Sequence, residues 1–197
     1  MALEIGQAVG PVELVNLGGH PRVMNNYADH VVTAVIFLSA RCDATLARIA
    51  DINAMLRGED AEDSVFVGIC SNSEESGEEL RTFCQNRGVV FPVYRDIEGK
   101  AARQFGARVT PEAFLLDKAG KLVYRGGLDG LAEAVKLQSA RKKVKQPQTE
   151  AVGTPIDRPG PKRDIPNPYG APAFASELVF TQIPGAPVHH CSTITET

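Results

Sequence analysis

The residue with the clearest chemical potential is a cysteine, Cys42, which lies between two different hydrophobic patterns. The apolar run VVTAVIFLS, typical of a buried strand, ends three residues before it, and apolar residues at helical spacing follow it. A thiol at a helix N-terminus lies near free amide N–H groups, which favour the nucleophilic thiolate. Arg41 adds a positive charge, whereas the carboxylate of Asp43 disfavours a second anion. The pattern predicts an acidic, functional thiol; the alternative is an inert thiol sealed beneath the helix end.

The elements that would position this cysteine alternate between strands and helices up to about residue 140. The predicted strands are 12–17, 31–39, 64–70, 91–96, 113–117 and 121–126, and the predicted helices lie within 42–56, 71–88, 98–107 and 131–144. Strand–helix–strand crossovers require parallel pairing, and the closing hairpin adds antiparallel strands. These elements predict the α/β class with a central mixed β-sheet flanked by helices, the thioredoxin-like fold.

Proline usage divides the chain near residue 140. Four of the 13 prolines precede this point and nine follow it, where apolar periodicity is weak. We therefore expect a thioredoxin-like domain over residues 1–140 and a Pro-rich, extended or disordered C-terminal tail over 141–197, with little helix or strand. We expect the tail to lie on the surface of the domain or of a neighbouring molecule, with the side chains of Phe174, Val179 and Phe180 as its anchors.

A second chemical motif is the segment RVTPEAFLLD, residues 108–117, where Pro111 directly precedes a predicted buried strand. In a thioredoxin-like fold this is the place of a cis peptide, so we predict a cis bond between Thr110 and Pro111. The backbone of Thr110 would then stay free to pair with a substrate strand. The alternative is an ordinary trans proline at the start of a strand.

Over residues 5–137 the chain resembles the redoxin branch of the peroxiredoxin family, which comprises alkyl hydroperoxide reductase and thiol-specific antioxidant proteins, and related bacterial thiol-disulfide oxidoreductases. The most specific stretches are GARVTPEAFLLD and KLVYRG, supported by FPVYRDIEGKAARQFGA. The resemblance implies a thioredoxin fold with the reactive thiol at Cys42 and the cis-proline at Pro111. It also implies thiol-dependent redox chemistry, either thiol-disulfide exchange or peroxide reduction.

This sequence departs from the family pattern around the thiol. Dithiol members have a second cysteine where this chain has Thr45, and peroxiredoxins have a proline and a threonine where it has Val35 and Ser39. A dithiol mechanism through positions 42 and 45 is excluded. We expect the Thr45 hydroxyl to face the sulfur.

Four catalytic-site residues besides Cys42 are therefore predicted: Arg41, Thr45, Thr110 and Pro111. The candidate thiols for resolving an oxidised Cys42 are Cys70, which ends the neighbouring parallel strand, and Cys191 in the tail, or an external thiol. Cys84 lies on an apolar helix face and is expected in the core.

The sequence is compatible with two classes of function. In the first, a one-cysteine oxidoreductase reacts with a thiol or disulfide protein, or with a small thiol such as glutathione. In the second, an eroded redoxin scaffold is a protein- or peptide-binding module, whose groove beside Pro111 holds a peptide, a partner protein or its own tail.

The tail ends in APVHHCSTITET, which is similar to an eroded c-type haem segment. The attachment pattern CxxCH would need a cysteine and a histidine at positions occupied by Ile194 and Thr195, so we expect no haem and no other cofactor. His189, His190 and Cys191 are weak candidate ligands for a soft or borderline metal ion; the alternative is a solvated tail end.

Composition argues against several other classes of function. The net charge of −3 and the short basic cluster RKKVK give no case for a nucleic-acid partner. The longest apolar run is too short to cross a membrane, and the N-terminus lacks the pattern of a signal peptide. The chain is expected to be cytoplasmic as written, or periplasmic if a leader was removed. Homo-oligomers through the C-terminal tail are also compatible with the sequence.

Overall fold

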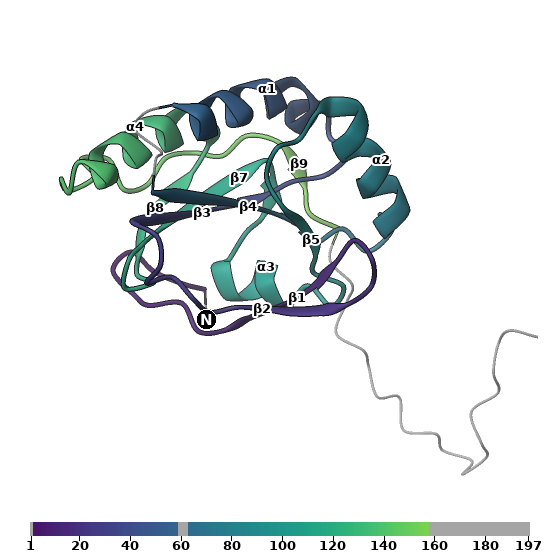
Figure 1. The fold of residues 1–197 in the computed structure, drawn as a ribbon, viewed down its shortest axis with the longest axis horizontal. Helices are drawn as coiled ribbons and strands as arrows, with labels where there is room; N and C mark the ends of the chain where they lie inside the picture. The colour runs from purple at the N-terminus through teal and green to yellow at the C-terminus, as the bar shows by residue number, and fades with distance from the viewer. Residues whose placement is uncertain (1, 59–62, 158–197) are drawn as a thin grey trace, which may run out of the picture. The chain divides into compact units, whose positions relative to one another are not determined.

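The computed structural model of the protein describes residues 2–58 and 63–157 and has at its centre one mixed sheet of seven strands (Figure 1). The strands, in the order in which they lie across the sheet, are β2 (Pro21–Met24), β1 (Val12–Asn16), β5 (Val93–Arg95), β4 (Ser64–Cys70), β3 (Val32–Phe37), β7 (Glu112–Asp117) and β8 (Leu122–Gly126). The β3–β4 and β4–β5 pairs are parallel, and the other pairs are antiparallel. The thioredoxin-like fold is thus confirmed, and this sheet contains one strand, β2, beyond the six predicted from the sequence.

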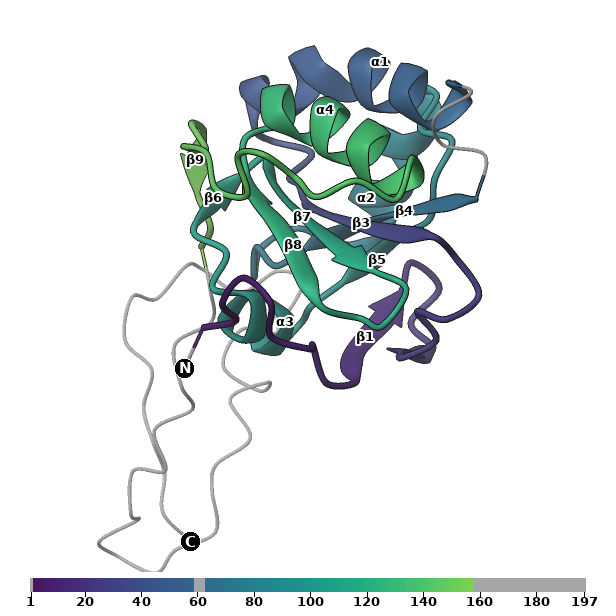
Figure 2. The same ribbon diagram turned by 90° about the vertical axis from the view of Figure 1, so that its left-hand side faces the viewer.

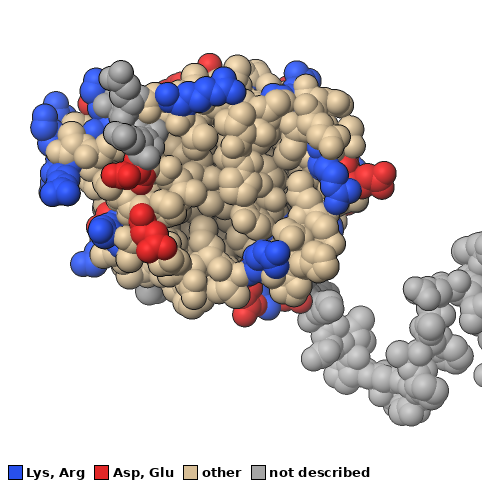
Figure 3. Space-filling view, in the orientation of Figure 1, with Lys and Arg blue, Asp and Glu red and all other residues tan. Residues whose placement is uncertain are grey.

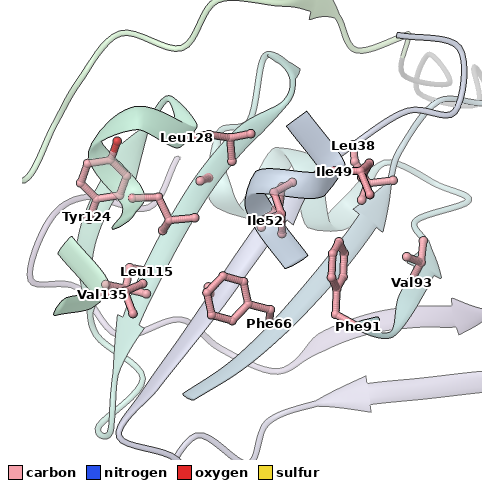
Figure 4. Close-up of a cluster of buried hydrophobic side chains, with 14 of the residues drawn as sticks. Leu38, Ile49, Ile52, Phe66, Phe91, Val93, Leu115, Tyr124, Leu128 and Val135 are labelled. Atoms are coloured by element: carbon pink, nitrogen blue, oxygen red, sulfur yellow. The ribbon is translucent and has the colours of Figure 1, made fainter. Parts of the chain in front are cut away.

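Helices cover both faces of this sheet. The helices α1 (Asp43–Arg57), α2 (Gly77–Arg87) and α4 (Leu128–Ser139) lie on one face, and the short α3 (Lys100–Phe105) lies on the other (Figure 1). The central strand β3 explains why both faces are covered, because its side chains alternate between two apolar clusters, one on each face of the sheet. Ala34 and Ile36 join the cluster under α1, α2 and α4, part of which is drawn in Figure 4. Val35 and Phe37 join the cluster on the α3 face.

The N-terminal hairpin supplies the strand that the sequence patterns missed. Strand β2 pairs with β1 in antiparallel register, with Val12 opposite Met24. All of its residues except Met24 are exposed, so β2 has no alternation of buried and exposed side chains that would mark it as a strand. It lies at the sheet edge, where the proline at its start costs no interior hydrogen bond.

Helix α4 ends five residues earlier than predicted. Arg141 adopts a left-handed backbone conformation with φ of 56°, and the Lys142 amide donates to the Leu137 carbonyl at 2.7 Å. This pattern closes a helix C-terminus. The chain then turns back, and Val144, expected as the last residue of a helix, is buried in the cluster beneath α1 and α4.

Residues 147–157, here called the strap, continue along the domain rather than leaving it at residue 140. The strap includes β9 (Thr154–Pro155), which pairs antiparallel with β6 (Val109–Thr110) (Figure 2). Ile156 is buried among the apolar residues of the α3 face. The packed chain therefore extends past the predicted boundary, because Val144 and Ile156 add to the core. Phe174, Val179 and Phe180 lie outside the described residues.

The helices and side chains of the described residues indicate neither a membrane span nor a metal site. None of the described helices is long and apolar enough to cross a membrane. Within residues 2–58 and 63–157 there is no cluster of three His, Cys, Asp or Glu side chains placed to hold a metal ion. His189, His190 and Cys191 lie outside these ranges. On the face in Figure 3, charges of both signs are interspersed around a largely uncharged middle.

Candidate active site

Cys42 lies at the sheet edge where the parallel strands β3 and β4 both end. It is the N-cap residue of α1, with extended backbone angles, and its side chain is only 1% exposed. The thiol donates to the Thr110 carbonyl oxygen at 2.9 Å, and the Thr154 hydroxyl donates to the sulfur at 3.3 Å. The cysteine thus lies between the loop before β7 and the strap.

The hydrogen-bond donors around the sulfur decide the acidity of this thiol. Burial raises the pKa of Cys42, but the side chain and backbone amide of Thr154, the backbone amide of Thr45 and the side chain of Thr110 outweigh it. The pKa is lowered from 9.0 to about 7. A group with this pKa is about half ionised at neutral pH, so the described site holds an acidic thiol.

The motif around Pro111 has the predicted backbone. The peptide bond between Thr110 and Pro111 is cis. Thr110 is 1% exposed, and its carbonyl oxygen is the acceptor for the Cys42 thiol. The predicted residues Cys42, Thr110 and Pro111 are therefore brought together, although they are far apart in the sequence.

A family model described as AhpC/TSA family matches residues 5–125, which is more than half of the chain. The chain belongs to the AhpC/TSA family. No curated protein matches the sequence. Among solved structures, a hypothetical protein of Sinorhizobium meliloti 1021 is 25% identical, with a TM-score of 0.72 over 82% of this chain and 98% of that one.

Two further solved structures share the fold of this AhpC/TSA protein. A peroxiredoxin-like protein of Aquifex aeolicus is 16% identical, with a TM-score of 0.59 over 70% of this chain and 89% of that one. A thiol-disulfide oxidoreductase of Bacteroides fragilis is 17% identical, with a TM-score of 0.55 over 66% of this chain and 99% of that one.

The sequence predicted that the side chains of Arg41 and Thr45 act on the Cys42 sulfur, but in the structure each has a different role. The Arg41 guanidinium binds the Glu79 carboxylate at 2.7 and 2.9 Å and ties the loop before α1 to α2. It is not among the groups that lower the pKa of Cys42. Thr45 stabilises the thiolate through its backbone amide, while its buried hydroxyl has no hydrogen-bond partner among the described residues. Arg41 thus positions the loop, and the charge stabilisation comes from uncharged donors.

Glu75 holds the loop that leads to the cysteine, and the sequence patterns did not single it out. Its carboxylate is 1% exposed and accepts from the Ser39 hydroxyl at 2.5 Å, the Ala40 amide at 2.6 Å and the Asn72 side-chain amide at 2.6 Å. In the sequence it belongs to the run EESGEE, which indicates only the acidic start of a helix. Its burial depends on the tertiary fold.

Glu112 fixes the other side of the site. This buried carboxylate accepts from the backbone amides of Arg108 at 2.7 Å and Val109 at 3.4 Å, and the Arg125 guanidinium lies 3.7 Å away. It thereby holds the loop that carries β6 and Thr110. The position of Glu112, directly after Pro111, was the only signal available in the sequence.

Two cysteines were proposed to resolve an oxidised Cys42. Cys70 lies within the residues that the structure describes, and Cys191 lies outside them. Cys70 ends β4 and is 2% exposed, within the cluster beneath the helices. Burial and, to a smaller extent, the nearby Glu75 carboxylate raise its pKa to about 12. It is therefore protonated at neutral pH, which makes it a poor nucleophile in this conformation. Cys84 is half-buried against the same cluster.

Proposed function

We propose that this protein is a thiol-disulfide oxidoreductase that uses Cys42 alone. The observation that supports this most is the lowered pKa of Cys42, about 7 in a side chain that is almost fully buried. A buried structural thiol has a raised pKa, because desolvation disfavours the anion. Donors from Thr154, Thr45 and Thr110 outweigh that effect at Cys42, which is the requirement for a nucleophile at neutral pH.

The proposed reaction has two exchanges. The Cys42 thiolate attacks one sulfur of a partner disulfide, forms a mixed disulfide and releases the other sulfur as a thiolate. A second thiolate then attacks the mixed disulfide, takes the partner sulfur and restores the Cys42 thiolate. Thr45 has no thiol and Cys70 is protonated and covered, so the second thiolate comes from outside, from a protein or a small thiol such as glutathione.

Peroxide reduction is the second reaction open to such a thiolate, and the site favours it less. It would form a sulfenic acid on Cys42 and release an alcohol or water. Two polar groups close to Cys42 in sequence are otherwise engaged. The hydroxyl of Ser39, which stands in the place of the family's threonine, donates to Glu75, and the guanidinium of Arg41 donates to Glu79. Neither is directed toward an oxygen held at the sulfur.

The binding-module function also has an observation in its favour. The backbone edge at Thr110, where a partner strand would pair, is occupied by the protein's own residues 154 and 155. A scaffold without chemistry could keep such an internal contact. The reactivity of Cys42 separates the two functions, because only the oxidoreductase requires it.

The decisive experiment is a pH titration of the alkylation of Cys42 in the full chain carrying Cys70→Ser, Cys84→Ser and Cys191→Ser. We expect the rate to follow the thiolate fraction with a midpoint near pH 7, as the lowered pKa requires. The same chain with Cys42→Ser provides the blank. If Cys42 reacts only after unfolding, over the whole pH range, the oxidoreductase is wrong and the binding module takes its place.

A further inference from the structure

The strap is fastened at both ends of its path across the site. At its start, the Arg125 amide donates to the Pro147 carbonyl at 2.9 Å and the Thr149 amide donates to the Arg125 carbonyl at 3.1 Å. At its end, the Ile156 amide donates to the Arg108 carbonyl at 2.9 Å, and Asp157 pairs with Asn72 and Ser73. Between these two points the chain passes over Cys42.

At the middle of this path, the strap makes the contacts expected of a bound peptide strand. Thr154 lies opposite Thr110 in the antiparallel β6–β9 pair, beside the cis-proline. Its side chain is directed at the active-site thiol, with Oγ1 at 3.3 Å from the Cys42 sulfur. A cysteine in this place would bring its own sulfur next to that of Cys42, so that only a short approach would give the S–S length of about 2.05 Å.

We propose that residues 153–156 are an internal mimic of the substrate, which is an extended peptide segment of another protein with a disulfide-bonded cysteine in the place of Thr154. This inference rests on the proposed function and specifies its substrate. The peptide pairs with β6 through its backbone, as in other cases of strand addition. Its cysteine sulfur joins Cys42, and the sulfur to which it was bonded leaves as a thiolate.

The surroundings of the strap also predict which sequence such a peptide carries. A Cβ atom on Gly153 would lie 2.1 Å from the Thr110 carbonyl oxygen, which belongs to the backbone and has little room to move. Glycine is therefore favoured as the residue before the cysteine. Pro155 shows that the next residue needs no N–H group, and buried Ile156 shows that an apolar side chain is favoured at the following position. The preferred sequence is Gly-Cys-any-apolar.

Because the mimic occupies the site, it must leave before the substrate binds. Val152, in the middle of the strap, is 78% exposed, so few contacts hold that part of the chain down. Val152 and Glu150 also line one side of a pocket of about 250 Å³ beside Pro111 and the first turns of α1. Opening from this side uncovers the thiol and the edge of β6 together.

The first test is a cross-link at the position of the mimic. In the chain whose only native cysteine is Cys42, Thr154→Cys is treated with diamide, which takes up the two hydrogen atoms released when a disulfide forms. We expect nearly complete bonding to Cys42. Val152→Cys, two residues away and exposed, is the matched control and should stay reduced. Equal bonding in both variants, or none in Thr154→Cys although both thiols react after unfolding, would overturn the inference.

The second test opens the site with Gly153→Ala, using Val152→Ala as the control. Alkylation above pH 9 reports access alone, because Cys42 is then ionised in either variant. We expect Gly153→Ala to raise this limiting rate by roughly tenfold or more, as expected when a local opening becomes easier. The midpoint of the pH profile should move upward at the same time, since the donors of Thr154 leave with the strap. An unchanged limiting rate in a folded variant contradicts the mimic.

The third test compares two peptides on the opened Gly153→Ala protein. Each peptide, with the core Gly-Cys-Pro-Ile or Ala-Cys-Pro-Ile, carries its cysteine as a disulfide to thionitrobenzoate, whose release is coloured. We expect the glycine peptide to react roughly tenfold faster, because the alanine Cβ would meet the Thr110 carbonyl. Equal rates would refute the mimic but leave the proposed function intact. If neither peptide reacts while an alkylating reagent labels Cys42, the proposed function itself fails.

Discussion

Cys70 ends β4, and Cys42 follows the neighbouring parallel strand β3 as the N-cap residue of α1. The two cysteines are almost equally buried, with 1% of the surface of Cys42 and 2% of that of Cys70 exposed. Their acidities are opposite, since the pKa of Cys42 is lowered to about 7 and that of Cys70 is raised to about 12. Burial raises the pKa in both cases. The neighbours differ, because Cys42 faces several N–H and O–H donors from three threonines, whereas Cys70 lies near the carboxylate of Glu75. Burial alone therefore does not decide the acidity of these two thiols; the groups that reach each sulfur do.

The largest expected effect is a difference between Cys42 and Cys70 in their reaction with oxidised glutathione. After incubation with oxidised glutathione, the mass of the native protein should increase by one glutathione, carried by Cys42. Cys42→Ser should abolish this adduct, and Cys70→Ser should leave it unchanged, because the raised pKa keeps Cys70 protonated. An adduct that depends on Cys70 would show that the two sites are not as different as their environments indicate.

The next effect concerns the donor that the strap supplies. Thr154→Val removes the hydroxyl that donates to the Cys42 sulfur, so the pKa should rise from about 7. Alkylation at pH 6 should slow by roughly fivefold, which corresponds to the loss of one hydrogen bond of about 1 kcal/mol. Thr154→Ser keeps the hydroxyl and should behave like the native chain. Equal midpoints for the valine and serine variants would assign the acidity to the backbone donors alone.

Glu75 offers a way to change both sites together. Glu75→Ala leaves the Ser39 hydroxyl and the Ala40 amide without their buried acceptor, so the free energy of unfolding should fall by about 3 kcal/mol. The pKa of Cys70 should fall as well, because the carboxylate that raises it is gone. The neighbouring Glu74→Ala is the control. Its exposed side chain lies 3.6 Å from Arg41, and its loss should cost less than about 0.5 kcal/mol in urea unfolding.

A further difference between the two thiols is the pH dependence of stability. The folded-state pKa of Cys42 lies below the ordinary value of 9.0, so its stabilisation is present above pH 9 and is lost as the pH falls toward 7. The pKa of Cys70 lies above 9.0, so its stabilisation is present below pH 9 and is lost as the pH rises toward 12. Urea midpoints of Cys42→Ser should thus approach the native value below pH 7. The urea midpoint of Cys70→Ser should rise relative to that of the native protein above pH 9. If the midpoints of both variants changed with pH in the same way as the native midpoint, the opposite pKa shifts of Cys42 and Cys70 would be contradicted.

The sequence predicted the parts of the molecule that local patterns encode. The apolar run before Cys42 and the helical spacing after it predicted the position of this cysteine at a helix N-terminus, and the proline before a buried strand predicted the cis bond after Thr110. The donor set around the sulfur is a tertiary property. Thr154 is 112 residues from Cys42 and lies in a segment that resembles a linker by composition. Arg41 was assigned to the sulfur because it is adjacent in sequence, but its nearest carboxylate is on α2.

The pairing of the strap with Arg125 also covers part of an edge strand. Strand β8 is the last strand on its side of the sheet, and an uncovered edge strand can pair with the same edge of another molecule. Residues 147–149 bond to the amide and carbonyl of Arg125 and fill part of that edge. The Thr149 hydroxyl, 2.6 Å from the hydroxyl of buried Tyr124, fastens them further. A strap that opens only beyond residue 149 can thus expose the thiol while the edge of β8 stays covered, so reactivity is gained without a surface for aggregation.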